Sequence, residues 1–487
     1  MALVQVTNLT FHYEGSYDNI FEHADFSFDT AWRLGFIGRN GRGKTTFLHL
    51  LLGQYAYEGK IEAPIDFDYF PPPVPDHIQT RAMLEAACPG AENWRMEREL
   101  SRLDVDLDVL GRPFSTLSNG ERTKALIAAM FLRENRFLLI DEPTNHLDMA
   151  GRAAVARYLN AQSGFLVVSH DRAFLDAAVD HILAINRATI EVQAGNFSSW
   201  YTNKELRDHF ELEKNDRLKK DIRRLTDTAR EKAEWSDRIE ATKIGGHAGD
   251  RGRIGHLSAR MMQRSKAIEV RKNREIEDKK KLLKDIECTD SLRIQPLCHH
   301  ATRLVEMKGV SIFYGARAAV RNADLLVERG DRVVLQGNNG SGKTSLLRLI
   351  LGEDMACAGD MHMASGLKIS YVPQDPSFLR GDLQHYIDAH SVDGTLMRTI
   401  LRKLDFARVQ FEKDMADLSA GQKKKVLIAR SLCERAHLYI WDEPLNYVDV
   451  LSRMQIEELL IASAPTLLFV EHDAAFCERV ATKVAAL

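Results

Sequence analysis

The eight residues Gly38–Thr45, which read GRNGRGKT, decide the fold of this chain. They match the pattern G-x-x-x-x-G-K-[ST], in which glycines let backbone N–H groups close around a phosphate while the lysine neutralises its oxygens. The short apolar run Gly35–Ile37 precedes this loop, and Thr45–Leu48 continues it in a pattern that suits a helix. The stretch therefore predicts a strand, a phosphate loop and a helix in succession.

The same pattern occurs a second time, at Gly337–Thr344 (GNNGSGKT), after the apolar run Val333–Leu335. Four further landmarks follow each loop in the same order, at an offset that stays near 300 residues. They are Leu117–Glu121, Phe137–Glu142, Asn145–Asp148 and Ser169–Asp171 in the first copy, and Leu418–Gln422, Leu438–Glu443, Asn446–Asp449 and Glu471–Asp473 in the second. A constant offset marks duplicated domains. We therefore predict an α/β chain with two P-loop NTPase domains.

A segment of different composition separates the two copies. It is rich in Lys, Arg and Glu, and its apolar residues recur at three- and four-residue steps on both sides of a glycine-rich break at residues 244–252. This pattern predicts a long antiparallel two-helix hairpin. About 35 residues per helix, at about 1.5 Å each, would form an arm of about 50 Å. The predicted domains are 1–202, the hairpin 203–290 with its tip near 236–263, and 301–487.

Composition narrows the class of protein. A net charge of −3 in 487 residues points to no partner by itself, and six scattered cysteines without C-x-x-C spacing suit reduced thiols in the cytoplasm. Cys298, His299 and His300 are adjacent, and a plain loop is favoured over a metal site because adjacent residues rarely converge on one ion. The N-terminus has no signal-peptide pattern, and no run approaches the ~18 apolar residues of a membrane span. The sequence thus predicts a cytoplasmic protein with no membrane domain.

The phosphate loops predict ATP and Mg²⁺ as ligands. Lys44 and Lys343 would neutralise the phosphate oxygens, and Thr45 and Thr344 would place hydroxyls on Mg²⁺. The predicted ATP contacts of the two loops are Gly38, Asn40, Gly41, Gly43, Lys44, Thr45 and Thr46, and Gly337, Asn339, Gly340, Gly342, Lys343, Thr344 and Ser345.

Acidic residues and histidines follow the buried strands that are predicted in each copy. Asp141 and Asp442 would hold Mg²⁺, and Glu142 and Glu443 are the candidates that polarise the attacking water. His170 and His472 would orient that water. An isolated Asp-Glu pair would more often be a solvated acidic turn, but the phosphate loop upstream and the histidine downstream favour a catalytic site.

These landmarks together resemble the ATP-binding-cassette superfamily. The resemblance implies that each Leu-Ser-x-Gly-Glu/Gln segment reaches the γ-phosphate bound by the other domain. In one composite site, the first domain would supply Lys44, Asp141, Glu142 and His170, and the second domain would supply Ser419, Gly421 and Gln422. In the other, the second domain would supply Lys343, Asp442, Glu443 and His472, and the first domain would supply Ser118, Gly120 and Glu121. The chain would thus pair its own two domains as a monomer.

The resemblance also assigns single residues. Tyr13 and Tyr314 match the aromatic residue that stacks on adenine, although a core tyrosine at a strand end is an open alternative. Gln374 matches the glutamine that contacts Mg²⁺, whereas the first copy has Pro72 at that place. Proline offers no side-chain ligand. Arg42 against Ser341, and Asn119 against Ala420, add to the asymmetry, so the two sites are expected to be inequivalent.

Two fused cassettes, a helical arm between them and no membrane domain resemble the ABC-F proteins over nearly the whole chain. That likeness implies an ATPase that binds the E site of the 70S ribosome when loaded with ATP, with its linker directed toward the peptidyl-transferase centre, and that leaves on hydrolysis. The segments Tyr439–Asp449, Val470–Asp473, Ile37–Thr45 and Ala233–Ser236 resemble the antibiotic-resistance branch, the Lsa-type ribosomal protection proteins. Protection against lincosamides, streptogramin A compounds and pleuromutilins is then expected, with general translational regulation as the alternative.

The charge of the arm favours RNA as a partner. Residues 217–274 hold 17 Lys and Arg against 8 Asp and Glu, while the remainder of the chain is acidic. A basic projection suits a phosphate backbone, although a solvated helical face would show the same charge. The predicted contacts to rRNA or P-site tRNA are Arg251, Arg253, His256, Arg260, Arg264 and Lys266. Residues 236–263 contain no aromatic side chain, which argues against direct reach into a drug pocket. Two rival classes are the ATPase subunit of a transporter and a DNA-maintenance ATPase.

Overall fold

A computed structural model of the chain describes residues 2–13, 19–75, 77–90, 92–145, 147–186, 189–241, 296–315 and 317–487. Contacts divide the chain into two compact units. One comprises Met1–Trp200 and Thr289–Leu487, and the other comprises Tyr201–Cys288. Both phosphate loops therefore belong to the same compact unit.

The first domain contains two sheets. The larger has the order β5-β6-β7-β3-β8-β9, with all neighbours parallel except β8 and β9, and the smaller is the antiparallel sheet β2-β1-β4. The strands are β1 Leu3–Phe11, β2 Phe21–Asp29, β3 Arg33–Ile37, β4 Glu58–Glu62, β5 Asp66–Phe70, β6 Arg136–Asp141, β7 Phe165–Val168, β8 His181–Asn186 and β9 Thr189–Ala194.

The second domain repeats this plan. Its parallel sheet has the order β14-β15-β16-β12-β17, and its antiparallel sheet has the order β11-β10-β13. The strands are β10 Arg303–Tyr314, β11 Arg317–Glu328, β12 Arg332–Gln336, β13 Ala356–Met363, β14 Ile369–Val372, β15 Leu438–Asp442, β16 Leu467–Val470 and β17 Lys483–Ala486. Five strands correspond one to one between the parallel sheets, which confirms the duplicated α/β fold.

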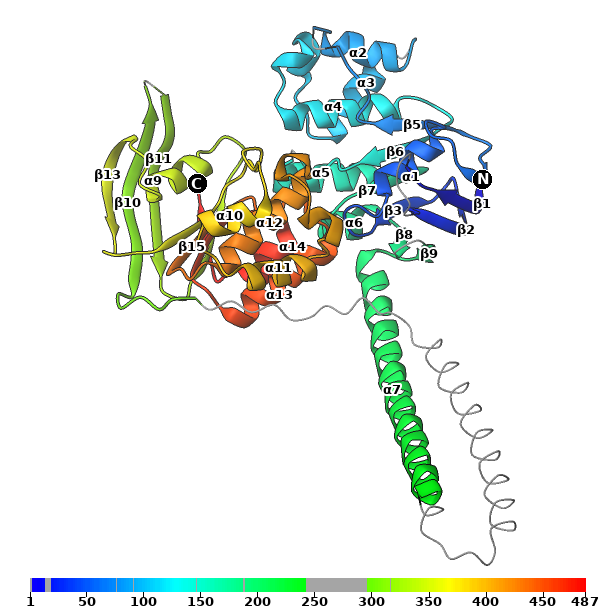
Figure 1. Ribbon diagram of the computed structural model, residues 1–487. Coiled ribbons are helices and arrows are strands. Elements are labelled where there is room, and N and C mark those ends of the chain that lie inside the picture. The colour runs from blue at the N-terminus through cyan, green and yellow to red at the C-terminus, as the bar shows by residue number, and fades with distance from the viewer. Residues whose placement is uncertain are drawn as a thin grey trace, which may run out of the picture. The chain divides into compact units, whose positions relative to one another are not determined.

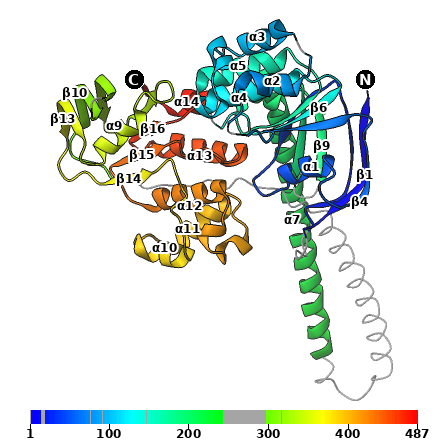
Figure 2. The ribbon, with the colours of Figure 1, turned by 90° about the horizontal axis from the view of Figure 1, so that it is seen from above.

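Helices connect the strands and cover the sheets. They are α1 Lys44–Leu51, α2 Thr80–Ala87, α3 Asn93–Arg102, α4 Asn119–Phe131, α5 Met149–Asn160 and α6 Arg172–Ala178 in the first domain, and α9 Lys343–Ile350, α10 Leu383–Ala389, α11 Gly394–Lys403, α12 Ala420–Cys433, α13 Val450–Ser463 and α14 Ala474–Val480 in the second. Helices α2, α3 and α4 gather at one side of the first domain, and α10, α11 and α12 do so in the second (Figures 1 and 2). Each domain therefore has a helical part beside its sheets.

Burial explains why the central strands form. All four residues of β7 and all four of β16 are buried, as parallel strands covered on both faces require. Phe47 of α1 packs its ring against Phe36 of β3, with centroids 5.5 Å apart, in a core that also includes Phe28 of β2. Helix α1 thus joins the two sheets of the first domain and fixes the position of the loop before it.

The long helix α7, Phe197–Ala241, follows β9 directly. It begins before the predicted boundary at residue 203 because Phe197 and Trp200 are buried. Asp176 of α6 accepts a 2.8 Å hydrogen bond from the backbone N–H of Ser198, which ties the first turn of α7 to α6. The helix also runs beyond residue 236, where the tip was predicted to start. The predicted second helix of the hairpin, the glycine-rich break and the six predicted RNA contacts lie outside the described residues.

Candidate ATP sites

Both phosphate loops have the backbone that their glycines permit. Gly43 and Gly342 are the N-caps of α1 and α9 and adopt φ values of 90° and 92°. A Cβ added at Gly43 would lie 2.3 Å from Ile20 Cγ2, and one at Gly342 would lie 2.4 Å from Val320 Cγ2. Only glycine therefore fits at either position, where a helix N-terminus presents N–H groups to an anion.

The loop lysines fold back over their own loops. Lys44 Nζ donates to the carbonyl oxygens of Gly38 at 2.7 Å and Arg39 at 3.2 Å. Lys343 Nζ donates to the corresponding carbonyls of Gly337 at 2.8 Å and Asn338 at 3.0 Å. Burial lowers the pKa of both lysines. Each ammonium group is thus held at the place where a phosphate would replace its carbonyl partners.

The predicted metal carboxylates end two equivalent strands. Asp141 closes β6 and its Oδ2 accepts a 2.9 Å hydrogen bond from the hydroxyl of Thr45. Asp442 closes β15, and burial raises its pKa to about 6. Both carboxylate oxygens of Asp442 are buried, and the hydroxyl of Thr344 lies beside them and partly offsets the effect of burial on the pKa. A buried carboxylate in this state is costly unless a cation or donor reaches it.

Each candidate catalytic glutamate faces its predicted histidine. His170 Nε2 lies 3.0 Å from Glu142 Oε1, and His472 Nε2 lies 3.6 Å from Glu443 Oε1. Burial opposes ionisation of Glu443, yet the neighbouring polar groups of His472 and Gln374 lower its pKa to about 2. Burial raises the pKa of Glu142, but the neighbouring His170 outweighs this effect, so that the pKa of Glu142 is lowered. Both glutamates are thus held as carboxylates, the form that a general base requires.

The glutamates also share an unusual backbone conformation. Glu142 has φ of 48° and Glu443 has φ of 46°, in the left-handed region that disfavours side chains with a Cβ. Each is held there by a backbone hydrogen bond, from Glu142 N to Val168 O at 2.9 Å and from Glu443 N to Val470 O at 3.0 Å. Strained backbone of this kind concentrates at functional sites.

The signature segments begin helices α4 and α12. Ser118 Oγ accepts from Glu121 N while Glu121 accepts from Ser118 N at 2.7 Å, a capping box. Ser419 and Gln422 form the same arrangement at α12. Glu121 and Gln422, which were predicted as nucleotide contacts, therefore also stabilise the helix starts that present Ser118 and Ser419.

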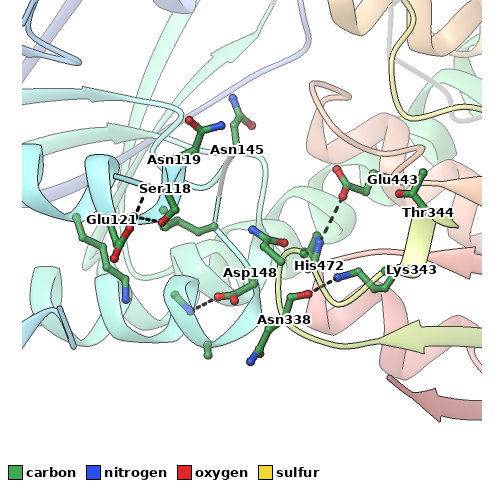
Figure 3. A pocket seen from close by; sticks show the side chains of 18 of the residues that line it. Ser118, Asn119, Glu121, Asn145, Asp148, Asn338, Lys343, Thr344, Glu443 and His472 are labelled. Atoms are coloured by element: carbon green, nitrogen blue, oxygen red, sulfur yellow. Dashed lines mark hydrogen bonds and ion pairs between the residues drawn. The ribbon is translucent and has the colours of Figure 1, made fainter. Parts of the chain in front are cut away.

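One cavity of about 980 Å³ joins the two domains (Figure 3). Its wall from the second domain includes Lys343, Thr344, Gln374, Glu443 and His472, together with Asn339, Gly340, Gly342 and Ser345. Its wall from the first domain includes Ser118, Gly120 and Glu121. The structure thus brings residues of the second phosphate loop and of the first signature segment around one space. Asp442, Gly337 and Tyr314 do not line this cavity.

The first phosphate loop also contacts the opposite domain. Asn40 Nδ2 donates to the carbonyl of Tyr447 at 2.6 Å, and Arg42 Nη2 lies 3.4 Å from Asp405 Oδ1. A Cβ added at Gly421 would lie 2.7 Å from Asn40 Nδ2. The second signature helix therefore starts beside the first phosphate loop. Arg42 of that loop forms an ion pair with Asp405, whereas the second loop has Ser341 at the equivalent position.

The two predicted adenine tyrosines lie over their phosphate-loop helices. Tyr13 Oη is 2.8 Å from Thr46 Oγ1, and Tyr314 Oη is 3.1 Å from Ser345 Oγ. Their exposed fractions, 41 % and 51 %, do not suit the alternative of a core tyrosine at a strand end. Stacking on a base remains a prediction.

Several residues of the sites carried no signal in the sequence. Lys424 of α12 donates to the carbonyls of Pro373 and Glu443, both at 2.9 Å, and burial lowers its pKa to about 8. Lys425 forms a buried 2.7 Å ion pair with Asp449. Their roles depend on partners distant in the chain, so no local pattern could reveal them.

These features define the class of protein. Two P-loop domains, each with a strand-end Asp-Glu pair and a histidine, and each with its phosphate loop facing the signature helix of the other, make a tandem ATP-binding-cassette ATPase. The chain belongs to the ABC transporter family, whose model matches residues 21–145 and 320–446, more than half of the sequence, and within it to the ABC-F group. It is accordingly an ATP hydrolase.

Curated relatives cover almost the entire chain. The ribosome protection protein VmlR of Bacillus subtilis (strain 168) is 29 % identical over 491 residues, which cover 98 % of this chain and 85 % of VmlR. The energy-dependent translational throttle protein EttA of Escherichia coli O6:H1 is 25 % identical, with 96 % of this chain and 89 % of EttA covered. The chain is therefore similar to complete proteins and not to isolated domains.

Solved structures agree with the fold. A complex of the archaeal ribosomal stalk protein aP1 with the archaeal ribosome recycling factor aABCE1 contains a chain that matches with a TM-score of 0.62 and 19 % identity, over 98 % of this chain and 87 % of that one. A model of ribosome-bound archaeal Pelota and ABCE1 gives the same TM-score, with 21 % identity and coverage of 98 % and 76 %. At these identities the likeness shows the tandem-cassette fold alone.

Proposed function

We propose that this ATPase binds the ribosome in its ATP-loaded form, at the E site, with the linker directed toward the peptidyl-transferase centre. The observation that supports this most is the cavity between Lys343 and Ser118, because a nucleotide there would be held by both domains. ATP would then join the cassettes within one monomer, and hydrolysis would let them separate and release the ribosome. The names of VmlR and EttA support a role in translation, and hence in the cytoplasm.

Hydrolysis is assigned to the glutamate-histidine pairs. Glu443 lines the cavity as a carboxylate and His472 lies 3.6 Å from it. A water between Glu443 and a γ-phosphate bound at Lys343 would give its proton to that carboxylate. Glu142, His170 and Lys44 offer the same groups in the first cassette.

Mg²⁺ is the cofactor that these sites fit. Thr45 with Asp141, and Thr344 with Asp442, supply the hydroxyl and carboxylate oxygens that Mg²⁺ prefers, and Gln374 adds an amide oxygen in the second site. The buried carboxylate of Asp442, beside the hydroxyl of Thr344, supports this assignment. When bound, Mg²⁺ would neutralise charge on the phosphate oxygens.

Protection of the ribosome against lincosamides, streptogramin A compounds and pleuromutilins is the proposed biological role. The 29 % identity with VmlR over 98 % of the chain supports it. The second candidate is regulation of translation without resistance, which the similarity to EttA favours. A transporter subunit is a weaker alternative, and no helix among the described residues is long and apolar enough to cross a membrane.

A pull-down tests the proposal. Cells expressing Glu142→Gln plus Glu443→Gln should yield the protein bound to 70S ribosomes in ATP, while Lys44→Ala plus Lys343→Ala should not bind. Recovery of the double glutamine variant on membranes or DNA instead would contradict the ribosomal role. A drug panel in a susceptible host then separates the two candidates, since unchanged inhibitory concentrations would leave translational regulation.

A further inference from the structure

The first ATP site has a contact that the second lacks, and it involves Tyr69 of β5. The Tyr69 hydroxyl donates a 3.1 Å hydrogen bond to Asp141 Oδ2, the oxygen that also accepts from Thr45. Asp141 is the proposed Mg²⁺ carboxylate of this site. Its Oδ2 is therefore held by two hydroxyl groups from different elements.

The equivalent tyrosine makes no such contact. Tyr371 lies in β14 opposite Ile440, two residues before Asp442, just as Tyr69 lies opposite Leu139, two residues before Asp141. Yet the hydroxyl beside Asp442 is that of Thr344, and no hydrogen bond from Tyr371 to this carboxylate is found within the described residues. The same residue type at the same register thus contacts the carboxylate in one site only.

The asymmetry coincides with the change from glutamine to proline. Gln374 follows Tyr371 by three residues, lines the cavity and bonds to Glu443, whereas Pro72 occupies the matching place after Tyr69. Proline has no side-chain donor or acceptor to offer. The first site consequently lacks that polar group but has the tyrosine hydroxyl on its carboxylate.

We propose that Tyr69 is a positioning residue of the first site, where its hydroxyl orients Asp141 for Mg²⁺. A carboxylate with one oxygen fixed by Tyr69 and Thr45 has its other oxygen turned to a defined direction, so less ordering is needed when the cation binds. The ring of Tyr69 is itself held, with its centroid 5.4 Å from that of His49 on α1. This inference rests on the proposed Mg²⁺ sites.

The test measures Mg²⁺ at one site at a time. Lys343→Ala removes nucleotide binding from the second site, and a fluorescent, non-hydrolysable ATP analogue is then titrated with Mg²⁺. Adding Tyr69→Phe should raise the Mg²⁺ midpoint about tenfold, the usual size of such supporting contacts. Affinity for the analogue in EDTA and the metal-free melting temperature should stay unchanged, because phenylalanine keeps the ring packing.

Tyr371→Phe in a Lys44→Ala background is the matched control and should shift the midpoint less than twofold. An unchanged midpoint for Tyr69→Phe would overturn the inference, as would equal shifts at both sites or an equal loss of affinity in EDTA. If the parent proteins bind the analogue without any Mg²⁺ dependence, the proposed metal sites themselves are wrong. The two failures are therefore distinguishable.

Discussion

Arg172 of the first cassette and Glu457 of the second form an ion pair in which the glutamate is fully buried. Arg479 of the second cassette completes the group, with its Nη1 2.6 Å from Glu457 Oε1. When helices α5 and α6 are matched to α13 and α14 by their aspartate N-caps, the three equivalent positions are Ala156, Ala474 and Ala177. The charged residues Arg172, Glu457 and Arg479 therefore correspond to alanines when the two cassettes are superimposed by sequence, so this ion-pair group is not repeated at the equivalent positions.

Removing Glu457 should destabilise the cassette pair. Glu457→Ala would leave Arg172 buried without this carboxylate, at a cost of about 3 kcal/mol. Urea denaturation without nucleotide measures the loss. Arg172→Met combined with Glu457→Leu should recover most of it, since an apolar pair replaces the charges. A double variant as unstable as Glu457→Ala would show that the pair is not the cause.

The glutamates should each be required for turnover in their own site. Glu443→Gln should slow phosphate release from the second site by about 100-fold or more while ATP still binds, because the carboxylate that accepts the proton is lost. Glu142→Gln should do the same in the first site. Single-turnover phosphate release with one loop lysine replaced measures each site separately, and Glu85→Gln, on the exposed face of α2, is the control. Undiminished turnover in the double variant would remove both glutamates from the mechanism.

Asp442 should make stability depend on pH in the absence of metal. Its folded pKa of about 6 lies above the ordinary value of 3.8, so the carboxyl is preferentially protonated in the folded chain and its ionisation destabilises the fold as pH rises from 4 to 6. Asp442→Asn should therefore be more stable than the parent at pH 8, by about 2–3 kcal/mol, with little gain at pH 4. Thermal unfolding in EDTA across this range measures the difference. A gain that is equal at both pH values would contradict the assignment.

Closure of the first site should be sensitive to one methyl group. A Cβ at Gly421 would lie 2.2 Å from the carbonyl oxygen of Tyr447, besides its approach to Asn40. Gly421→Ala should thus push the signature helix from the first phosphate loop and lower ATP turnover there by about tenfold or more. Gly111→Ala, which meets nothing within 4 Å, is the matched control. Equal activity of the two variants would mean that this contact does not persist with nucleotide.

Local chemistry determined how much of the site was predictable. Lys44, Asp141, Glu142 and His170 each follow a strand within a pattern that needs only neighbouring residues, so a prediction from sequence could be made for them. The equivalent residues of the second cassette, Lys343, Asp442, Glu443 and His472, could be proposed because the sequence pattern occurs twice.

Contacts that depend on distant partners were not predictable. Tyr69 stands in an ordinary strand, and its bond to Asp141 arises only from the register of β5 on β6. Arg172 and Glu457 are separated by 285 positions, and nothing in their surroundings marks them as a pair. Helix α7 begins at Phe197, before the predicted segment boundary at residue 203, and the burial of Phe197 and Trp200 that accompanies this start was not evident from helical periodicity.

Helix α6 has two attachments only four residues apart. Arg172 at its start holds Glu457 of the second cassette, and Asp176 accepts the N–H of Ser198 in the first turn of α7. Because Arg172 and Asp176 belong to the same short helix, a rotation that the second cassette imposes on Arg172 would also displace Asp176. Asp176 in turn holds Ser198 in the first turn of α7. Helix α6, of seven residues, is therefore the element through which a movement of the second cassette would reach Ser198.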